Sequence, residues 1–594
     1  MCGIAGVFAY GVSAPPVERN TLSRMNDAMI ARGPDGEGTW LGPEDRIGFG
    51  HRRLSIIDLS DSGAQPMIFE EGRLGITYNG EIYNFRELRT ELEAQGRRFR
   101  SESDTEVLLH LYDRDGTSMV DRLRGMFAFA IYDRDKQGIF LARDGFGIKP
   151  LYYANDGQTL RFASQVKALL AGGGIDTTPS APGLAGVYVW GSVPEPWTLF
   201  DKIRSLPAGS TMWVGSDGTR GPIRYFDVTE ELEQAAANPI PWSPSALREA
   251  LLDTLKHHLV SDVPVGAFLS AGLDSATIIA LTSELQPDAL RSVTLAFDEY
   301  NGTEFDEAAL AENIARHYET SHQTQRVKGA NFHEEYQRLC TAMDQPTIDG
   351  VNTYFVSKVT ADTGLKVAMS GLGGDEFFGG YPAFTEIPRI VGALGKIPGI
   401  RFAGRAFRKI AGPAIGTAMS PKYAGVFEYG STYPDAYLLR RAIFMPWELP
   451  KLMDTTMARD GWAELEETTG LRHQVDRLDT SRTKISALES TWYMRNQLLR
   501  DSDWAGMAHS LEIRVPLVDT VFFRKIAPML VSHAPPGKRD MASSPTKPLP
   551  AEVISRPKTG FAVPLPAWLM KDNPDALKQG YRGWLRKVVE DCYA

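Results

Sequence analysis

The sequence predicts two domains of different class, a β-rich α+β domain followed by an α/β domain built on a parallel sheet. Three observations support this prediction. The chain has 594 residues, more than one hydrophobic core usually serves. Its first 226 residues or so contain short aromatic and β-branched runs broken by Gly, Asn and Asp. From about residue 245, strand-like and helix-like segments alternate.

The first region indicates hairpins of a sheet-on-sheet domain, because its short runs are separated by turn residues. The runs are RLGITYNGEIYNF (73–85), MFAFAIYD (126–133), GIFLARD (138–144) and PLYYAND (150–156). The stretch EELEQAAANPIPWSPSA (230–246) is polar and then proline-rich, which predicts a linker.

The second region alternates short apolar strands with segments of helical spacing. The strands are VPVGAFLS (263–270), SVTLAF (292–297) and LKVAMS (365–370), and the helices are DSATIIALTSEL (274–285) and EFDEAALAENIARHYE (304–319). This order predicts a parallel sheet covered by helices, which binds ligands at the carboxyl ends of its strands. Residues 385–500 indicate further helices without a recognisable motif.

Composition narrows the class of protein and its partners. Hydrophobic residues make up 43% of the chain and charged residues 23%, as in ordinary globular proteins. The net charge of −10 gives no reason to expect nucleic-acid binding. No apolar run approaches the ~18 residues of a membrane span, and the N-terminus lacks signal-peptide features. Cys2, Cys340 and Cys592 are too few and too scattered for a disulfide framework, so we expect a reduced cytoplasm.

The chain begins MCGIAG, with Cys2 directly after Met1. Removal of Met1 would leave Cys2 with both a thiol and a free α-amino group. An α-amino group titrates near ~8, so it can accept the thiol proton at neutral pH. A nucleophile that carries its own base indicates acyl-transfer chemistry.

Two small-residue loops follow strands of the predicted sheet, LSAGLDSA (269–276) and MSGLGGDEFFGGY (369–381). Small residues let backbone amides approach an anion, and a helix N-terminus behind them adds positive dipole. Each loop also carries an aspartate, Asp274 and Asp375, of the kind that holds a magnesium ion against phosphate oxygens. The spacing is not that of a Walker A loop.

The two halves together resemble the glutamine-dependent asparagine synthetases over nearly the whole chain. The motifs that carry this resemblance, besides those above, are RGPDG (32–36), HRRLSIIDLS (51–60), YNGEIYN (78–84), SDTEVLLH (103–110), LRGMFAFAIYD (123–133), GIKPLYY (147–153), SDVPVGAFLSAGLDS (261–275), HSLEIRVPLVD (509–519) and RPKTGFAVPLPAWL (556–569). The resemblance implies an αββα sandwich of the N-terminal-nucleophile kind, a class II glutamine amidotransferase domain, over residues 1–226. It implies a parallel-sheet pyrophosphate-loop ATPase domain with extra helices over residues 235–594.

The resemblance also implies residue roles in the first domain. Cys2 would attack the glutamine side-chain amide, and the Asn79 side chain with the Gly80 backbone N–H would form the oxyanion hole. The glutamine itself would be bound by Arg53 at its α-carboxylate and by Glu81 and Asp104 at its α-ammonium. His51 has no role in this scheme and is left as structural.

For the second domain the resemblance implies ATP-dependent formation of an acyl-adenylate, attacked by ammonia from the first domain. Asp274 and Asp375 would hold Mg²⁺, and Lys558 would stabilise charge at the phosphates. The residues implied for ATP binding are Leu269, Ser270, Gly272, Asp274, Ser275, Leu295, Ser370 and Gly371. The substrates would be glutamine, ATP and aspartate or another carboxylate, and dimers are common in the family.

The chain departs from the family pattern at several positions. Ala271 stands where the phosphate loop usually has glycine, Leu372 where aspartate-using members carry glutamate, and Gln165 where a glutamate is usual; DSDWAGMAHS (501–510) lacks the usual Arg and Ser. Three hypotheses therefore stay open. The first is an asparagine synthetase, the second an amidotransferase acting on a glycan uronic acid or a peptide carboxyl, and the third a regulatory protein that only binds glutamine or nucleotide.

Overall fold

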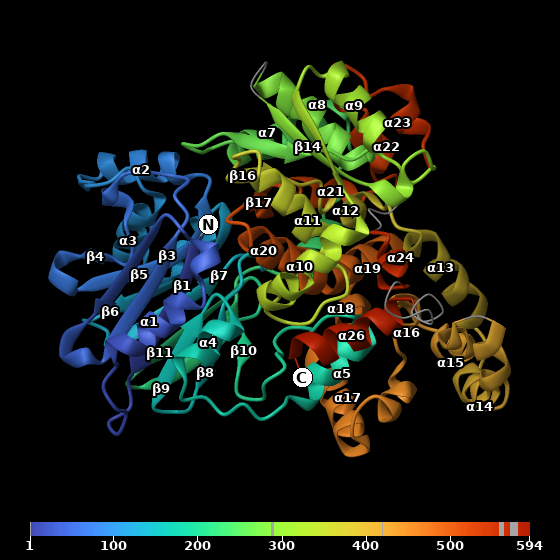
Figure 1. Ribbon diagram of the computed structural model, residues 1–594, viewed down its shortest axis with the longest axis horizontal. Helices are drawn as coiled ribbons and strands as arrows, with labels where there is room; N and C mark the ends of the chain where they lie inside the picture. The colour runs from blue at the N-terminus through green and yellow to red at the C-terminus, as the bar shows by residue number, and fades with distance from the viewer. Residues whose placement is uncertain (1, 287–289, 419, 558–562, 571–579, 594) are drawn as a thin grey trace.

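The computed structural model describes residues 2–286, 290–418, 420–557, 563–570 and 580–593. Its first half contains two six-stranded antiparallel sheets (Figure 1). The first sheet has the order β10 (Arg204–Ser205), β8 (Tyr152–Asn155), β9 (Thr159–Ala163), β1 (Cys2–Ala9), β3 (Ile47–Arg53) and β2 (Gly36–Leu41). The second has the order β12 (Gly218–Arg224), β11 (Ser210–Gly215), β7 (Gly138–Arg143), β6 (Gly125–Asp133), β5 (Leu74–Ile82) and β4 (Met67–Phe69).

Alternation along β1 shows how the layers form. Ile4 and Phe8 lie in the core between the two sheets, whereas Ala5 and Val7 face the opposite way, as the period of two in a strand requires. On that outer face lie α1 (Arg19–Asp27) and α4 (Val166–Gly172), and α3 (Asp104–Asp115) packs on the second sheet with α2 (Phe85–Ala94) beside it. The predicted αββα sandwich is confirmed.

The second half is built on a five-stranded parallel sheet, which the sequence also predicts correctly. Its order is β15 (Ser321–Val327), β14 (Arg291–Phe297), β13 (Val265–Phe268), β16 (Val367–Met369) and β17 (Glu512–Arg514). Among the helices around it are α7 (Pro244–His258), α8 (Leu273–Leu285), α9 (Ala308–His317) and α11 (Gly350–Ala361). Because β13 and β16 are parallel neighbours, the two small-residue loops leave the same sheet edge side by side.

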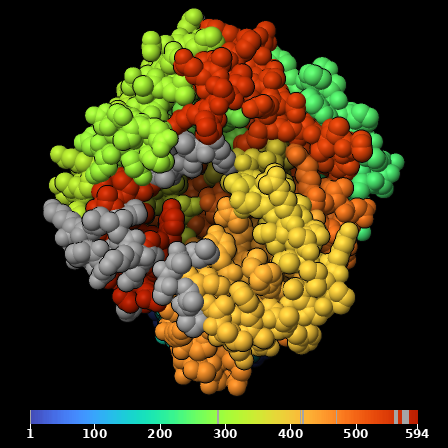
Figure 2. All heavy atoms as spheres, turned by 90° about the vertical axis from the view of Figure 1, so that its right-hand side faces the viewer, coloured from blue at the N-terminus to red at the C-terminus, as the bar shows by residue number. Residues whose placement is uncertain are grey.

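The helical region beyond residue 380 borders a hollow in the second half. Figure 2 shows this hollow between yellow-orange helical segments on one side and green and red segments on the other. Within the region, residues Glu489–Leu499 form a π-helix between α19 (Ser481–Leu488) and α20 (Arg500–Met507). The other α-helices of the described part of the chain are α5 (Ala181–Trp190), α6 (Val228–Ala236), α10 (Gly329–Ala342), α12 (Gly374–Phe378), α13 (Ala383–Leu394), α14 (Ile400–Ala418), α15 (Val426–Tyr429), α16 (Tyr433–Arg441), α17 (Thr455–Thr469), α18 (Leu471–Asp476), α21 (Thr520–Leu530), α22 (Lys538–Ala542), α23 (Ala551–Ser555), α24 (Leu565–Met570) and α26 (Tyr581–Tyr593).

The predicted linker 230–246 is partly wrong. Helix α6 (Val228–Ala236) occupies its first half, because the Asp227 carboxylate accepts hydrogen bonds from the backbone N–H groups of Thr229 and Glu230 and caps the helix. Such a cap stabilises the first turn. The connection itself is therefore short and lies between Ala236 and Pro244.

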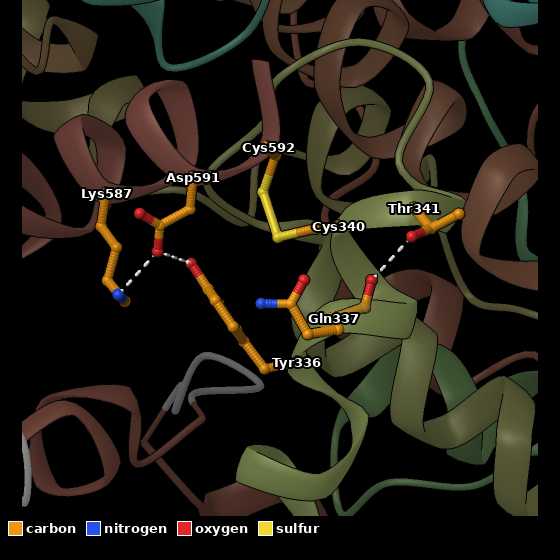
Figure 3. The surroundings of a disulfide bond; sticks show 7 residues. All are labelled: Tyr336, Gln337, Cys340, Thr341, Lys587, Asp591 and Cys592. Carbon is orange, nitrogen blue, oxygen red and sulfur yellow. Dashed lines mark hydrogen bonds and ion pairs between the residues drawn. A yellow bond between two sulfur atoms is a disulfide. The ribbon is translucent and has the colours of Figure 1, made fainter. Parts of the chain in front are cut away.

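The expectation from the scattered cysteines also needs correction, because Cys340 and Cys592 form a disulfide. The bond joins α10 to the C-terminal helix α26 across 252 positions of sequence (Figure 3). Beside it, Asp591 accepts hydrogen bonds from Tyr336 at 2.8 Å and from Lys587 at 2.7 Å. Cysteine spacing could not reveal a pair that only the packing of these two helices brings together.

None of the helices that the structure describes is both long enough and apolar enough to cross a bilayer.

Candidate active sites

Cys2 lies at the start of β1 and is buried. Its backbone N–H donates to Asn79 Oδ1 at 2.9 Å, so the main chain at Cys2 is held against β5. Burial raises the pKa of the Cys2 thiol. The resting thiol is therefore protonated near neutral pH, and an attack needs a group that removes its proton.

The neighbourhood of Asn79 suits a developing negative charge. Its Nδ2 is buried and donates no hydrogen bond within the described part of the chain, while its Oδ1 is engaged by Cys2. A buried amide donor without an acceptor is costly unless a ligand supplies one. The adjacent Gly80 has no room for a side chain, since a Cβ there would lie 2.1 Å from the Met126 carbonyl oxygen.

The structure brings Arg53 beside Cys2, because the two residues are paired across β1 and β3. The Arg53 guanidinium donates to the carbonyl oxygens of Ser60, at 2.7 Å, and Asp58. Arg53 therefore stabilises the loop after β3 and also lies near Cys2.

The two predicted ammonium-binding carboxylates differ in their surroundings. Asp104 Oδ2 accepts from the Tyr78 hydroxyl at 2.9 Å and from the Ile82 backbone N–H at 3.0 Å. Glu81 Oε2 accepts no hydrogen bond from any described residue and lies 3.6 Å from Arg514 Nη2 of the second domain. Burial raises the pKa of both carboxyls, and the Glu512 carboxylate raises that of Glu81 further.

Arg32, in the RGPDG motif, is a residue whose role the sequence analysis missed. Its Nε donates to the Cys2 carbonyl oxygen at 3.1 Å, and its two terminal nitrogens donate to Asp503 on α20 at 2.7 and 3.0 Å. Arg32 and Asp503 are 1% and 5% exposed. This pair links the main chain of Cys2 to the second domain. The RGPDG motif was the signal in the sequence that could have identified Arg32.

The first small-residue loop joins β13 to the N-terminus of α8. The Ser270 backbone N–H donates to Ser275 Oγ at 3.2 Å, and that of Gly272 donates to Ser270 Oγ at 3.2 Å. These amides lie at an uncapped N-terminus of a 13-residue helix, a place that suits phosphate. Ala271 has no left-handed backbone conformation, which explains why a methyl group fits in place of glycine.

The two predicted adenine-pocket leucines lie on adjacent strands. Leu269 directly follows β13, and its backbone N–H donates to the Val293 carbonyl oxygen of β14 at 2.9 Å. Leu295 lies further along β14, and both leucine side chains are buried. The structure thus places both leucines on neighbouring strands near the first loop.

The second loop meets the first through its glycines. The Ser370 backbone N–H donates to the Arg514 carbonyl oxygen at 2.8 Å. A Cβ at Gly371 would lie 2.8 Å from Asp274 Cβ, and one at Gly374 would lie 2.4 Å from Asp274 Oδ1. Glycine at both positions therefore permits the close approach of the loops.

Asp274 and Asp375 converge on Lys538 of α22, which the sequence analysis also missed. Lys538 Nζ is 2.9 Å from Asp375 Oδ1 and also pairs with Asp274. Burial alone would lower the pKa of Lys538, but the two carboxylates outweigh it and raise that pKa. Nothing in the motif PPGKRD distinguishes this lysine from a solvated one.

The donor set fits Mg²⁺ only together with phosphate. Within the described part of the chain, no three His, Cys, Asp or Glu side chains form a metal-binding group. Mg²⁺ is commonly held by one or two carboxylates, with substrate phosphates and water completing six oxygens. Asp274 and Asp375 supply the two carboxylates, so the set is suitable once ATP is bound.

Comparisons with known proteins agree with this two-centre architecture. The family described as "Glutamine amidotransferase domain" matches residues 1–226, and the family described as "Asparagine synthase" matches residues 246–587. The chain belongs to the asparagine synthase family. It is 31% identical to Asparagine synthetase [glutamine-hydrolyzing] 1 of Bacillus subtilis, with 100% of this chain and 90% of the relative covered.

Two further matches are a second curated relative and a solved structure. Asparagine synthetase [glutamine-hydrolyzing] 3 of Bacillus subtilis is 30% identical, with 87% of this chain and 79% of the relative covered. A solved structure titled glutamine phosphoribosylpyrophosphate amidotransferase from B. subtilis aligns at 17% identity and a TM-score of 0.29. That alignment covers 54% of this chain and 65% of the other.

Leu372, which departs from the asparagine synthase pattern, lies in the second loop. Leu372 packs partly buried against the core, and its side chain carries no group that could bind an ammonium or take up a proton. Four residues on, Glu376 is buried and accepts a hydrogen bond from the Tyr381 hydroxyl at 2.8 Å. Burial and the neighbouring Asp375 raise the pKa of Glu376 to about 7. Lys558 lies outside the described residues.

Proposed function

We propose that this chain is a glutamine-hydrolysing asparagine synthetase that amidates aspartate with ATP, forming AMP and pyrophosphate. The observation that carries the proposal is the meeting of the two small-residue loops, where Asp274, Asp375 and Lys538 form one charged cluster. The same chain holds a buried nucleophile against an unsatisfied amide donor. The family membership and the names of the relatives support aspartate as the acceptor.

In the glutaminase half, Cys2 Sγ would attack the glutamine side-chain carbonyl carbon. The thiol proton would pass to the α-amino group of Cys2, after removal of Met1, and from there to the leaving ammonia. Asn79 Nδ2 and the Gly80 N–H would donate to the oxyanion. Arg53 would bind the glutamine carboxylate, and Glu81 and Asp104 its ammonium. Water would then release glutamate from the thioester.

In the synthetase half, an aspartate carboxylate oxygen would attack the α-phosphorus and release pyrophosphate. Ser270, Gly272, Ser275, Ser370 and Gly371 would bind the phosphates through the amides and hydroxyls of both loops. Leu269 and Leu295 would contact the adenine, and Lys558 and Lys538 would stabilise the phosphate charge. Mg²⁺ held by Asp274 and Asp375 would supply further charge neutralisation when bound. Ammonia would attack the acyl carbon and release AMP.

The decisive experiment measures pyrophosphate release by the purified chain with ATP, magnesium and aspartate, and then detects asparagine by mass spectrometry. We expect asparagine and AMP in equal amounts, formed with either glutamine or ammonium chloride. In Cys2→Ala, synthesis from glutamine should stop and synthesis from ammonium should remain. Glutamine hydrolysis without aspartate-dependent pyrophosphate release would contradict aspartate as the acceptor, and loss of both activities in Cys2→Ala would contradict two separate centres.

A further inference from the structure

A cavity of ≈ 330 Å³ lies apart from both candidate centres. It is lined by α5 of the first family match and by α16, α17, α18 and the π-helix of the second, and Figure 1 shows α5 and α17 together at the bottom, just right of centre. None of its lining residues belongs to the glutamine or ATP sites. Ligand sites occur preferentially at such domain boundaries.

Three tryptophans form its aromatic walls. Trp190 of α5, Trp462 of α17 and Trp492 of the π-helix all line the cavity. The rings of Trp190 and Trp492 lie 4.6 Å apart between centroids and are tilted by 39°. Indole rings attract cations held within about 6 Å of their faces, more strongly than other aromatic rings do.

The charges on the walls are predominantly acidic. Asp435, Glu466 and Glu467 line the cavity, against the single lining cation Arg472. Arg472 Nη2 lies 3.5 Å from Asp435 Oδ1, and the guanidinium is half-exposed. Glu466 and Glu467 are exposed and Asp435 is buried, so the lining acids outnumber the lining cation beside the three indoles.

Asp435 is a buried acid that two arginines compensate only at long distance, Arg472 at 3.5 Å and Arg401 at 3.7 Å. The residue is 5% exposed, and its Oδ2 accepts no hydrogen bond from any residue that the structure describes. Arg401 Nη1, on a half-exposed side chain, forms an ion pair with this atom at 3.7 Å. A buried carboxylate oxygen without a donor costs more than a neutral one, so a ligand that donates here would be stabilised.

We propose that this cavity binds a small organic cation that carries N–H donors, a primary amine or a guanidinium on a short alkyl chain. The cationic end would donate to Asp435 and lie against the indole faces. The alkyl body would pack against Leu438 and Leu465, which also line the cavity. Such a ligand matches the charge of the acid, the aromatic walls and the volume of the cavity. An anion would be repelled by the acidic side chains of the lining.

The test is a titration of the full chain with 1,4-diaminobutane and with agmatine, followed by tryptophan fluorescence and calorimetry. We expect saturable binding of at least one of them, and no saturable binding of the neutral 1-butanol. Asp435→Asn should weaken binding about tenfold, the loss expected for one charged hydrogen bond. Glu464→Gln, an exposed position on α17 that does not line the cavity, should leave it unchanged.

Three outcomes would overturn the proposal: no saturable binding of either cation, equal binding of 1-butanol, or unchanged affinity in Asp435→Asn. Glutamine hydrolysis and circular dichroism of each variant show whether it is folded. If Asp435→Asn does not fold, Trp462→Leu decides, because that half-buried indole should be needed for affinity. Binding at this site is independent of which carboxylate the synthetase amidates.

Discussion

Lys538 illustrates how single residues define the proposed ATP centre. Its ammonium lies between Asp274 and Asp375, the two side chains that the sequence assigns to a magnesium ion. In this position the lysine compensates two acids that would otherwise repel one another and the phosphates of ATP.

Lys538→Met should therefore lower aspartate-dependent pyrophosphate release by about 100-fold or more, the loss expected when a positioned cation is removed from a phosphoryl-transfer site. Glutamine hydrolysis should stay within a factor of about two. Both rates are measured on the same preparation. Lys525→Met, a half-exposed lysine paired with Asp253, is the matched control, and an equal loss in both variants would contradict the assignment.

The Asn79 side chain is the proposed oxyanion donor of the glutaminase centre. Removing its Nδ2 in Asn79→Ala should lower kcat for glutamine hydrolysis about 10²–10³-fold, as for other single oxyanion-hole donors. Ammonium-dependent synthesis should be retained, because the second centre does not contain this residue. A variant with normal glutaminase activity would show that the unsatisfied amide has no part in catalysis.

The buried carboxyl of Asp501 should make the stability of the folded chain depend on pH. Burial and the neighbouring Asp349 raise the pKa of Asp501 to about 8, and its oxygens accept from Trp504 Nε1 and the Thr347 hydroxyl, both at 2.9 Å. The folded chain keeps a proton that the unfolded chain releases. The stabilisation is complete below the unfolded pKa near 3.8 and is lost as pH rises towards 8.

The amide introduced by Asp501→Asn cannot ionise, so the free energy of unfolding of this variant should not fall in this way as pH rises. We expect the variant to gain on the order of 2 kcal/mol in free energy of unfolding over the wild-type chain between pH 6 and pH 8. Urea unfolding at the two pH values gives the difference. A constant difference between the two proteins across this range would contradict a raised pKa of Asp501.

Between elements, one buried ion pair joins Arg32, which contacts the start of β1, to Asp503 of α20. Arg32 holds the Cys2 carbonyl and Asp503 together, so Asp503→Asn leaves a buried guanidinium without its counter-charge. Breaking such a pair commonly costs about 3–5 kcal/mol. We expect lower stability in urea and a fall in glutamine-dependent synthesis larger than the fall in ammonium-dependent synthesis.

The double variant Arg32→Met with Asp503→Leu removes both charges at once and should recover most of the stability, because no unpaired charge remains. It should not recover glutamine-dependent synthesis, since the Cys2 carbonyl still lacks its donor. Recovery of both properties would mean that the pair only fills space between the elements.

For the whole molecule, the disulfide between α10 and α26 closes a loop of 252 positions. Cross-links of long loops restrict the unfolded chain and stabilise the folded one by about 3 kcal/mol. Cys340→Ser with Cys592→Ser should therefore lower the Tm, and dithiothreitol should lower the Tm of the wild-type chain by a similar amount. Dithiothreitol should not change the Tm of the double variant, and any further drop would point to another cause.

Much of the architecture followed from local patterns. Short aromatic and β-branched runs bounded by turn residues, such as β5 and β6, are strong local signals, and so is the order of strand, helix and strand in β13, α8 and β14. Polar β15 and the short β17 carry no such signal, so the sequence did not predict these edge strands. Helix α6 was missed because its signal lay in the cap residue Asp227, just before the predicted linker.

Sequence alone was sufficient for the class of each domain, because that class depends on residue types and their order along the chain. The roles of Cys2 as nucleophile and of the two small-residue loops at phosphate stay predictions. Sequence alone was not sufficient for Arg32 with Asp503, Lys538 with its two aspartates, the disulfide or the tryptophan-lined cavity. Each of these joins groups from distant parts of the chain. Their meeting depends on how whole layers pack, and no local pattern records that.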